Sequence, residues 1–429
     1  MKKTILILSW FIASQFTVAQ TYSGGGGIIP DNGNQGNFLI TVNNLPVSGI
    51  DTIYGLESVC INIQHPADGE LKIQLTSPDG NNIILTENLG YDGDNFQNTC
   101  FNDDASQSIY NGNPPYNGSF RPLENVGYLN NGQNGNGLWG LNILDMYPAG
   151  NSGVLLSWTL TFSSNPGFPF PFDSTNLPII MINTFGQTIP DDPKILVGMK
   201  IIDNGEGNYN DKDDPPVYDN FAGIEIRGSS SQMFLKKSYG FETWDTMQNS
   251  IDTSLLGMPK ESDWILNANF SDKTLLRNAM AYQGFSDLGH YATRYRFVEL
   301  LLNDRYKGVY LFSEKIKRDK NRVDIAKLTS SMNYGDSLTG GYIVKIDKQT
   351  GSGGDGWESN FPPPVHPNGQ FIWFQYEYPK AEDITSPQKT YIQDYVKSFE
   401  SALNGPLFAD TALGFRKYAV EQSFIDDNG

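Results

Sequence analysis

The chain reads LWGLNILDM at residues 138–146 and VLLSWTLTF at residues 154–162, two runs in which apolar residues alternate with polar or small ones. Gly, Asn, Asp and Pro turns separate them from three earlier runs, which are FLITV at Phe38, SVCINIQ at Ser58 and ELKIQLTSPDGNNIILTE from Glu70 to Glu87. Runs of period two at this spacing predict an antiparallel β-sandwich over residues 37–164.

Composition limits the class of protein. A chain of 429 residues is expected to hold two domains, and the segment NPGFPFPFDSTN at residues 165–176 is predicted to link them. The second domain then covers residues 177–429. The net charge of -18 disfavours nucleic acids and anionic membranes as partners, because both are bound chiefly through basic surface.

The first twenty residues have the pattern of a secretory signal peptide, with Lys2 and Lys3 before an apolar run and small residues at its end. No later run is apolar enough to span a membrane, so the protein is predicted to be secreted or held at the bacterial cell surface. Cys60 and Cys100 are the two cysteines, and export favours a disulfide between them, the alternative being two buried thiols.

The N-terminal runs, together with FNDDAS at Phe101 and FRPLENVGYLNNGQNGNGLWGLNILD from Phe120, resemble the P domain (P/Homo B domain) of proprotein convertases. The resemblance implies a jelly-roll sandwich that stabilises or targets its neighbour and that sometimes binds calcium. A serine-endopeptidase association would rest on this domain alone, since no segment supplies a catalytic triad and a partner chain would have to provide one.

Cationic residues gather in IRGSSSQMFLKKSY, residues 226–239. Arg227, Lys236 and Lys237 flank a small-residue turn, a combination that suits the phosphates of a nucleotide, although solvated lysines on a strand are the alternative. Strand alternation predicts that one lysine points inward and pairs with a carboxylate, for which the candidates are Glu225, Glu299 and Glu314.

Two further elements are predicted nearby. Ser271 or Asp272 is expected to cap a helix that begins near Lys273 and carries Arg277 and Asn278 on its early turns. Arg277 is interpreted either as a phosphate clamp or as the partner of a neighbouring carboxylate. A hairpin with Asn303 and Asp304 in its turn follows.

Four blocks in the second domain resemble the CotH kinase family: GIEIRGSSSQMFLKKSYGFE, SLLGMPKESDWILNANFSDKTLLRN, YRFVELLLNDRYKGVYLFSEKIKRDKNRVDI and GGYIVKIDK. The resemblance implies an α+β, atypical protein-kinase-like fold and ATP-dependent phosphorylation of protein Ser or Thr with Mg or Mn. Its candidate nucleotide-binding residues are Arg227, Lys236, Lys237, Arg277, Asn278 and Glu314. Cell-surface or coat proteins are the expected partners.

Family members continue beyond the equivalent of this C-terminus into a block that bears aspartates. The second domain is therefore expected to be truncated before its catalytic and metal-binding carboxylates, and Asp426 and Asp427 are not assigned those roles. The competing hypothesis is a non-catalytic adhesion or scaffold module, since ATP is scarce outside cells.

Overall fold

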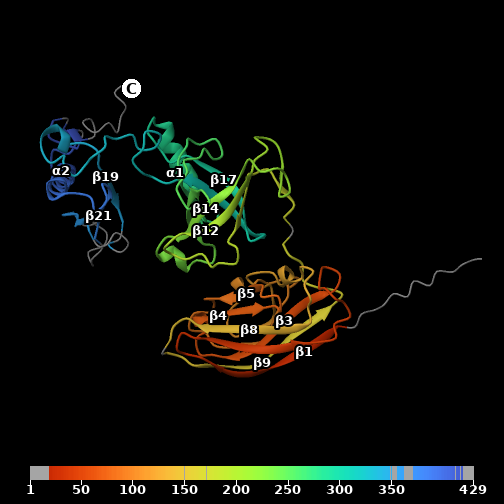
Figure 1. Cartoon of the computed structure of the whole chain (residues 1–429). Coiled ribbons are helices and arrows are strands. Elements are labelled where there is room, and N and C mark those ends of the chain that lie inside the picture. Colours follow the sequence, from red (N-terminus) through yellow and green to blue (C-terminus); the bar gives the residue numbers. More distant parts are fainter. Residues whose placement is uncertain are drawn as a thin grey trace, which may run out of the picture. The chain divides into compact units, whose positions relative to one another are not determined.

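The computed structural model describes residues 19–148, 150–170, 172–347, 349, 355–361, 371–410, 412–415 and 417–418. The chain forms two compact units that divide between Phe172 and Asp173 (Figure 1). We call them the sandwich unit and the barrel unit. Most of residues 1–20, where the signal peptide is predicted, lie outside the described residues, as do Asp426 and Asp427.

The sandwich unit consists of two sheets around one apolar core. One sheet has the order β1-β9-β3-β6-β7 and the other β2-β8-β4-β5. The strands are β1 (Gln20–Ile29), β2 (Gln35–Val42), β3 (Gly55–Gln64), β4 (Leu71–Thr76), β5 (Asn82–Glu87), β6 (Phe96–Phe101), β7 (Tyr116–Phe120), β8 (Gly137–Asp145) and β9 (Gly153–Ser163). The predicted sandwich is confirmed, with one parallel pair, β6 with β7.

The alternation in β8 explains how the core is filled. Trp139, Leu141 and Ile143 are fully buried, whereas Leu138 on the opposite face is half exposed. The disulfide between Cys60 and Cys100 is confirmed, and it joins neighbouring positions of β3 and β6 with an S–S distance of 2.09 Å.

The sandwich begins earlier than residue 37, the predicted boundary. β1 pairs along its length with β9, although its sequence QTYSGGGGII lacks apolar alternation. Its glycines permit the close contact, because a Cβ atom at Gly26 would lie 1.9 Å from the carbonyl oxygen of Leu155. A strand made of glycine has no side-chain pattern from which it could be predicted.

The barrel unit is built around seven strands that close in the order β11-β12-β14-β15-β16-β18-β17. They are β11 (Ile179–Asn183), β12 (Ile195–Ile202), β14 (Tyr218–Arg227), β15 (Ser238–Trp244), β16 (Asp263–Asn267), β17 (Tyr295–Leu302) and β18 (Arg305–Glu314). β11 pairs with β17 in parallel and so closes the barrel, whose interior is packed with apolar side chains.

Smaller elements complete this unit. Short strands β10 (Ser174–Thr175) and β13 (Asn210–Asp211) pair with each other, and α1 (Arg277–Asp287) follows β16. Beyond the barrel, β19 (Ile343–Ile346), β20 (Trp357–Glu358) and β21 (Trp373–Tyr378) form a sheet that shares an apolar cluster with α2 (Ser386–Asn404).

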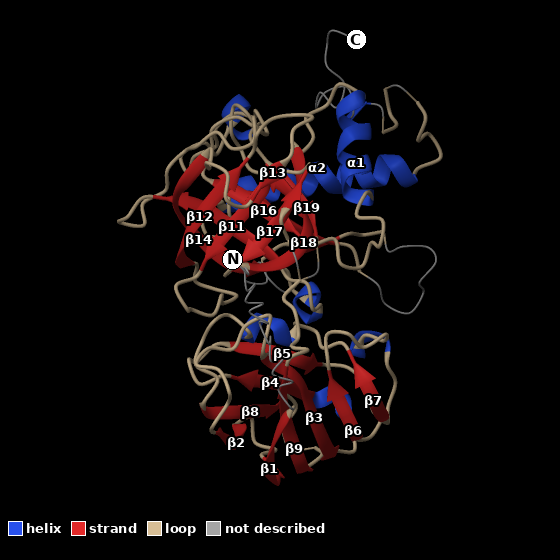
Figure 2. Cartoon of the chain, turned by 90° about the vertical axis from the view of Figure 1, so that its right-hand side faces the viewer, coloured by secondary structure: helices blue, strands red, loops and turns tan. Residues whose placement is uncertain are grey.

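Strands dominate both units (Figure 2). The structure shows a closed seven-stranded β-barrel in the second unit and does not confirm the predicted kinase-like α+β fold. The hairpin at Asn303 and Asp304 is confirmed, and both residues adopt the positive φ that a two-residue turn needs. Within the described residues, no helix is long and apolar enough to cross a membrane.

Candidate functional site

Lys236 and Lys237 precede a strand rather than forming part of one. They connect the 3-10 turn Ser230–Met233 to β15, which begins at Ser238. The prediction that strand alternation separates the two lysines is therefore wrong, and both side chains are half-buried. The turn follows Gly228, whose φ of +120° lies in the region that favours glycine.

Lys236 lies against the hairpin of β17 and β18. Its Nζ atom donates to the carbonyl oxygen of Val309 and lies 4.3 Å from the centre of the Tyr310 ring. Burial lowers the pKa of this lysine to about 8, and the negative charge of Glu299 acts in the opposite direction. Glu299 is itself buried and accepts a hydrogen bond from the hydroxyl of Tyr306 at 2.7 Å.

Lys237 is held by the turn that precedes it. Its Nζ atom donates to the carbonyl oxygen of Gln232 at 2.7 Å, and its own carbonyl accepts from the hydroxyl of Tyr310 at 3.0 Å. Arg227 ends β14 in register with Ser238, and its side chain is exposed. The three cationic residues are therefore neighbours at one end of the barrel.

The helix that carries Arg277 and Asn278 reaches the same end. Ser238 Oγ accepts a hydrogen bond from the backbone of Ala268 at 3.0 Å, and Asn278 Nδ2 donates to Asn269 Oδ1 at 3.3 Å. Residues 268–269 directly follow β16, so they connect the lysine segment to the helix.

The helix begins at Arg277, four residues later than predicted. Asp272 accepts the backbone N–H of Arg277 at 2.9 Å and the N–H of Thr274 at 3.1 Å, which confines residues 272–276 to a turn. The guanidinium of Arg277 lies 3.6 Å from the same carboxylate, and its side chain is 81% exposed. Arg277 therefore pairs with the carboxylate of Asp272, which is one of the two roles predicted for it, and its side chain remains accessible to solvent.

Five of the predicted residues thus share one end of the barrel, which we call the cationic end: Arg227, Lys236, Lys237, Arg277 and Asn278. Glu314 is not among them. It pairs with Trp264 at the start of β16, whereas the cationic end lies where β16 finishes. Glu314 therefore lies toward the opposite end of β16 from the lysines, and Glu299 is the carboxylate whose charge acts on Lys236.

Glu314 instead belongs to a buried ion network. Its fully buried carboxylate accepts from Arg294 Nη2 at 2.8 Å and lies 3.8 Å from Nε of Arg322, whose side chain is 1% exposed. Arg322 also contacts Glu261 at 2.8 Å, and its guanidinium lies over the ring of Trp264. The network fastens the segment after β18 to the wall of the barrel.

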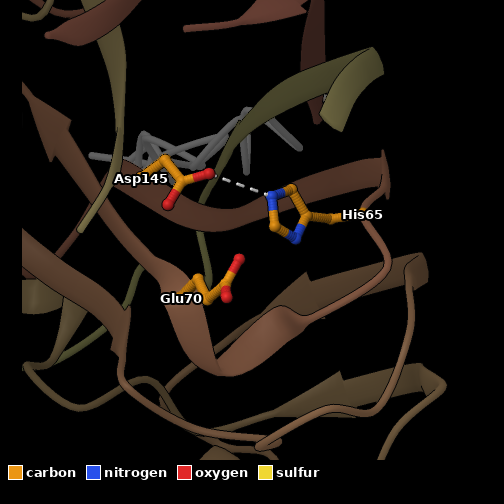
Figure 3. Close-up of side chains that lie close together, drawn as sticks. All are labelled: His65, Glu70 and Asp145. Atoms are coloured by element: carbon orange, nitrogen blue, oxygen red, sulfur yellow. Dashed lines mark hydrogen bonds and ion pairs between the residues drawn. The ribbon is translucent and has the colours of Figure 1, made fainter. Parts of the chain in front are cut away.

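A second group of polar side chains lies in the sandwich unit. His65, Glu70 and Asp145 approach one another so closely that one ligand atom from each lies within 4.8 Å of the others (Figure 3). His65 and Asp145 are fully buried, and Glu70 is half-buried. No local sequence pattern indicates this group, since Asp145 is eighty positions from His65.

Asp68, which lies between His65 and Glu70 in the sequence, is also buried. Its Oδ1 atom accepts the backbone N–H of Asn95 at 3.1 Å, and its Oδ2 atom has no hydrogen-bond partner among the described residues. Burial, with a smaller contribution from the charge of Asp94, raises the pKa of Asp68 to about 7. An unpaired buried carboxylate oxygen calls for a ligand or costs stability.

Comparison with known proteins agrees with this division. Residues 57–162 match the proprotein convertase P-domain, and residues 224–412 match the family described as CotH kinase protein. No curated protein matches the chain. One solved structure, that of the Aeromonas sobria serine protease (ASP) and chaperone (ORF2) complex, is 15% identical over 34% of this chain, with a TM-score of 0.21.

The match to that complex spans 27% of the other chain, and at this TM-score it supports no conclusion about fold or activity. Fold and site together define a two-unit, β-rich protein with a β-sandwich before a barrel that has a cationic end. More specifically, the sandwich unit is similar to the proprotein convertase P-domain over residues 57–162, and the barrel unit is similar to the CotH kinase protein family over residues 224–412.

Proposed function

We propose that the cationic end of the barrel binds the phosphates of ATP, and that the full-length protein transfers the terminal phosphoryl group to Ser or Thr of a protein substrate. The match to the CotH kinase protein family supports this reaction class. The observation that carries the proposal is that one segment with Arg227, Lys236 and Lys237 lies at one end of the barrel, next to the helix that begins at Arg277.

Phosphoryl transfer needs positioning and positive charge more than covalent chemistry from the protein. Lys236 supplies a half-buried ammonium beside Glu299, and the low polarity around it strengthens its attraction for phosphate. Arg277 supplies an accessible guanidinium that can approach two phosphate oxygens at once. Mg or Mn, once bound with the nucleotide, would neutralise charge on the phosphates.

Incubation of the full-length protein with labelled ATP, Mg or Mn and candidate surface proteins tests the proposal. We expect label on Ser or Thr of an acceptor or of the protein itself. Absence of transfer and of nucleotide binding with either metal would overturn it.

The pH dependence of ATP binding follows from the lowered pKa of Lys236. The ammonium form binds phosphate, so affinity is expected to be constant below pH 7 and to fall as the pH rises through about 8, where the free protein loses this proton. The Lys236→Arg variant should show no such fall, because arginine stays charged. Calorimetric titrations with ATP compare the unaltered protein with Lys236→Arg over a range from roughly pH 6.5 to 9, which brackets this pKa.

A non-catalytic adhesion or scaffold module is the competing proposal. It is favoured by one observation, that both lysine ammonium groups already donate to backbone carbonyls of the same unit. Under this proposal, the Lys236→Ala and Lys237→Ala variants would retain full binding to the cell surface. Added ATP would not reduce that binding.

We also propose that calcium binds the sandwich unit at Asp68, as the resemblance to P domains implies. The buried Oδ2 atom, which has no hydrogen-bond partner in the part of the chain that the structure describes, fits this ion because calcium takes oxygen ligands. Neighbouring Asp94 adds negative charge.

Calcium at about 100 times its dissociation constant is expected to raise the melting temperature of the sandwich unit by roughly 5 °C or more. Asp68→Asn should abolish this rise without weakening the calcium-free protein, since it removes an unpaired buried charge. Differential scanning calorimetry measures both effects. An Asp68→Asn variant that still responds to calcium would place the ion elsewhere.

A further inference from the structure

We propose that His65, Glu70 and Asp145 form a binding site for a divalent transition metal of the zinc class. This site is separate from the nucleotide site and from the calcium proposed at Asp68. Its three ligand atoms come from two segments that the fold brings together. His65 and Glu70 lie in the connection between β3 and β4, and Asp145 ends β8, which pairs with β4 so that Leu71 faces Asp145. Figure 3 shows the three side chains pointing toward one another.

The backbone holds the imidazole in a position suited to a metal ligand. His65 Nδ1 lies 2.9 Å from the carbonyl oxygen of Ala67 and 3.2 Å from the N–H of the same residue. The ring can take two tautomers: with its proton on Nε2 it accepts the Ala67 N–H at Nδ1 and donates to Asp145, and with its proton on Nδ1 it donates to the Ala67 carbonyl and turns the Nε2 lone pair toward Asp145. Metal binding at Nε2 requires the second tautomer. Histidines that bind metals commonly donate their other ring nitrogen to a backbone carbonyl in this way.

The distance between His65 Nε2 and Asp145 Oδ2 lies within the range of a hydrogen bond and also suits two ligands of one metal ion. It is 3.3 Å, whereas charge-assisted N–H···O bonds are typically about 2.7–2.9 Å. Two ligands each about 2.0–2.2 Å from one tetrahedral ion lie roughly 3.4 Å apart. The observed separation fits two ligands of one ion.

The charges in the cluster also favour a cation. Asp145 and Glu70 are two carboxylates, and among the described residues neither forms an ion pair with lysine or arginine. Asp145 is fully buried, and among the described residues His65 is the basic side chain in contact with it. A divalent ion would balance both carboxylates, which a single imidazolium cannot do.

The donor set identifies the class of metal. An imidazole nitrogen with two carboxylates suits zinc and its neighbours, whereas calcium and magnesium prefer oxygen alone. Hydrogen bonds position the carboxylates, since Asp145 Oδ1 accepts the N–H of Tyr147 at 3.0 Å and Glu70 accepts from Asn151 Nδ2 at 3.3 Å. Half-buried Glu70 opens the site to solvent, and three protein ligands leave one position for water.

Calorimetric titration of the full chain with zinc chloride, with the disulfide intact, tests the proposal. We expect one equivalent to bind with a dissociation constant of about 10 μM or tighter. Glu70→Gln and His65→Gln should each weaken zinc binding at least tenfold. Replacing a residue that only hydrogen-bonds to a metal ligand already lowers metal affinity about 10- to 100-fold, and these two residues are ligands themselves.

One matched variant serves as a control. His290→Gln removes a histidine of the barrel unit that stacks on Phe285, so it should leave zinc affinity unchanged. Glu70→Gln should keep its response to calcium. Because Glu70 is half-buried, this variant is expected to fold even if His65→Gln does not.

The proposal is overturned if the unaltered chain binds no zinc below about 1 mM, or if zinc binding survives Glu70→Gln unchanged. The first result would mean that a proton, not a metal, joins His65 to Asp145. A loss of zinc affinity in Asp68→Asn, with Glu70→Gln unaffected, would also contradict the assignment.

Discussion

Replacing Arg322 with Met is expected to lower the free energy of unfolding of the barrel unit by about 3–5 kcal/mol. The guanidinium is 1% exposed and contacts Glu261 at 2.8 Å, with Glu314 at 3.8 Å. Methionine fills similar space but leaves these buried carboxylates with less positive charge. It also removes the donors to the carbonyl oxygens of Lys315 and Asp263.

Urea denaturation measures the effect on the barrel unit. Lys315→Met is the matched control, because its ion pair with Asp263 is 3.5 Å long and its side chain is 44% exposed, so a change within about 1 kcal/mol is expected. The double variant Arg322→Met with Glu314→Gln should recover part of the loss. A loss below about 1 kcal/mol in Arg322→Met would show that the network is not structural, and the role given to Glu314 here would be wrong.

Replacing Trp139 with Ala is expected to destabilise the sandwich unit by about 3–5 kcal/mol. The indole is fully buried in β8, lies edge-on to Phe162 with ring centres 5.5 Å apart, and donates from Nε1 to the Gly135 carbonyl at 2.9 Å. Its removal leaves a cavity between the two sheets and an unpaired carbonyl.

The neighbouring residue provides the control for this prediction. Leu138 lies on the outer face of the same strand and is 52% exposed, so Leu138→Ala should change the free energy of unfolding by no more than about 0.5 kcal/mol. Thermal unfolding of both variants compares the two faces of β8. Equal losses would contradict the packing described for this sheet.

The sequence allowed the sandwich, the disulfide and the β17–β18 hairpin to be predicted because each depends on local pattern. Alternation identifies strands such as β8, and Asn303 with Asp304 identifies a turn. The barrel was not predicted, because its closure depends on the parallel pairing of β11 with β17, strands more than a hundred residues apart. No local pattern carries that information.

The dependence on long-range strand pairing also explains which parts of the candidate site could not be predicted from the sequence. Lys236 was expected on a strand because apolar and polar residues alternate around it, but it lies in the connection between the 3-10 turn Ser230–Met233 and β15. Glu314 and Glu299 were equally good partners by sequence. Only the register of β16 with β18 shows that Glu314 lies away from the lysines. The contact between His65 and Asp145 depends on sheet pairing in the same way.

Binding of nucleotide phosphate by Lys236 at the cationic end of the barrel can be measured by titration of the protein with ATP and magnesium at pH 7. The Lys236→Met variant is compared with Lys200→Met, which alters an exposed lysine on β12 that pairs with Asp219. We predict a loss of about 10- to 100-fold in affinity for Lys236→Met, the value of one charged hydrogen bond, and no change for Lys200→Met. Equal affinities for the two variants, or no ATP binding by the unaltered protein, would contradict this role of Lys236.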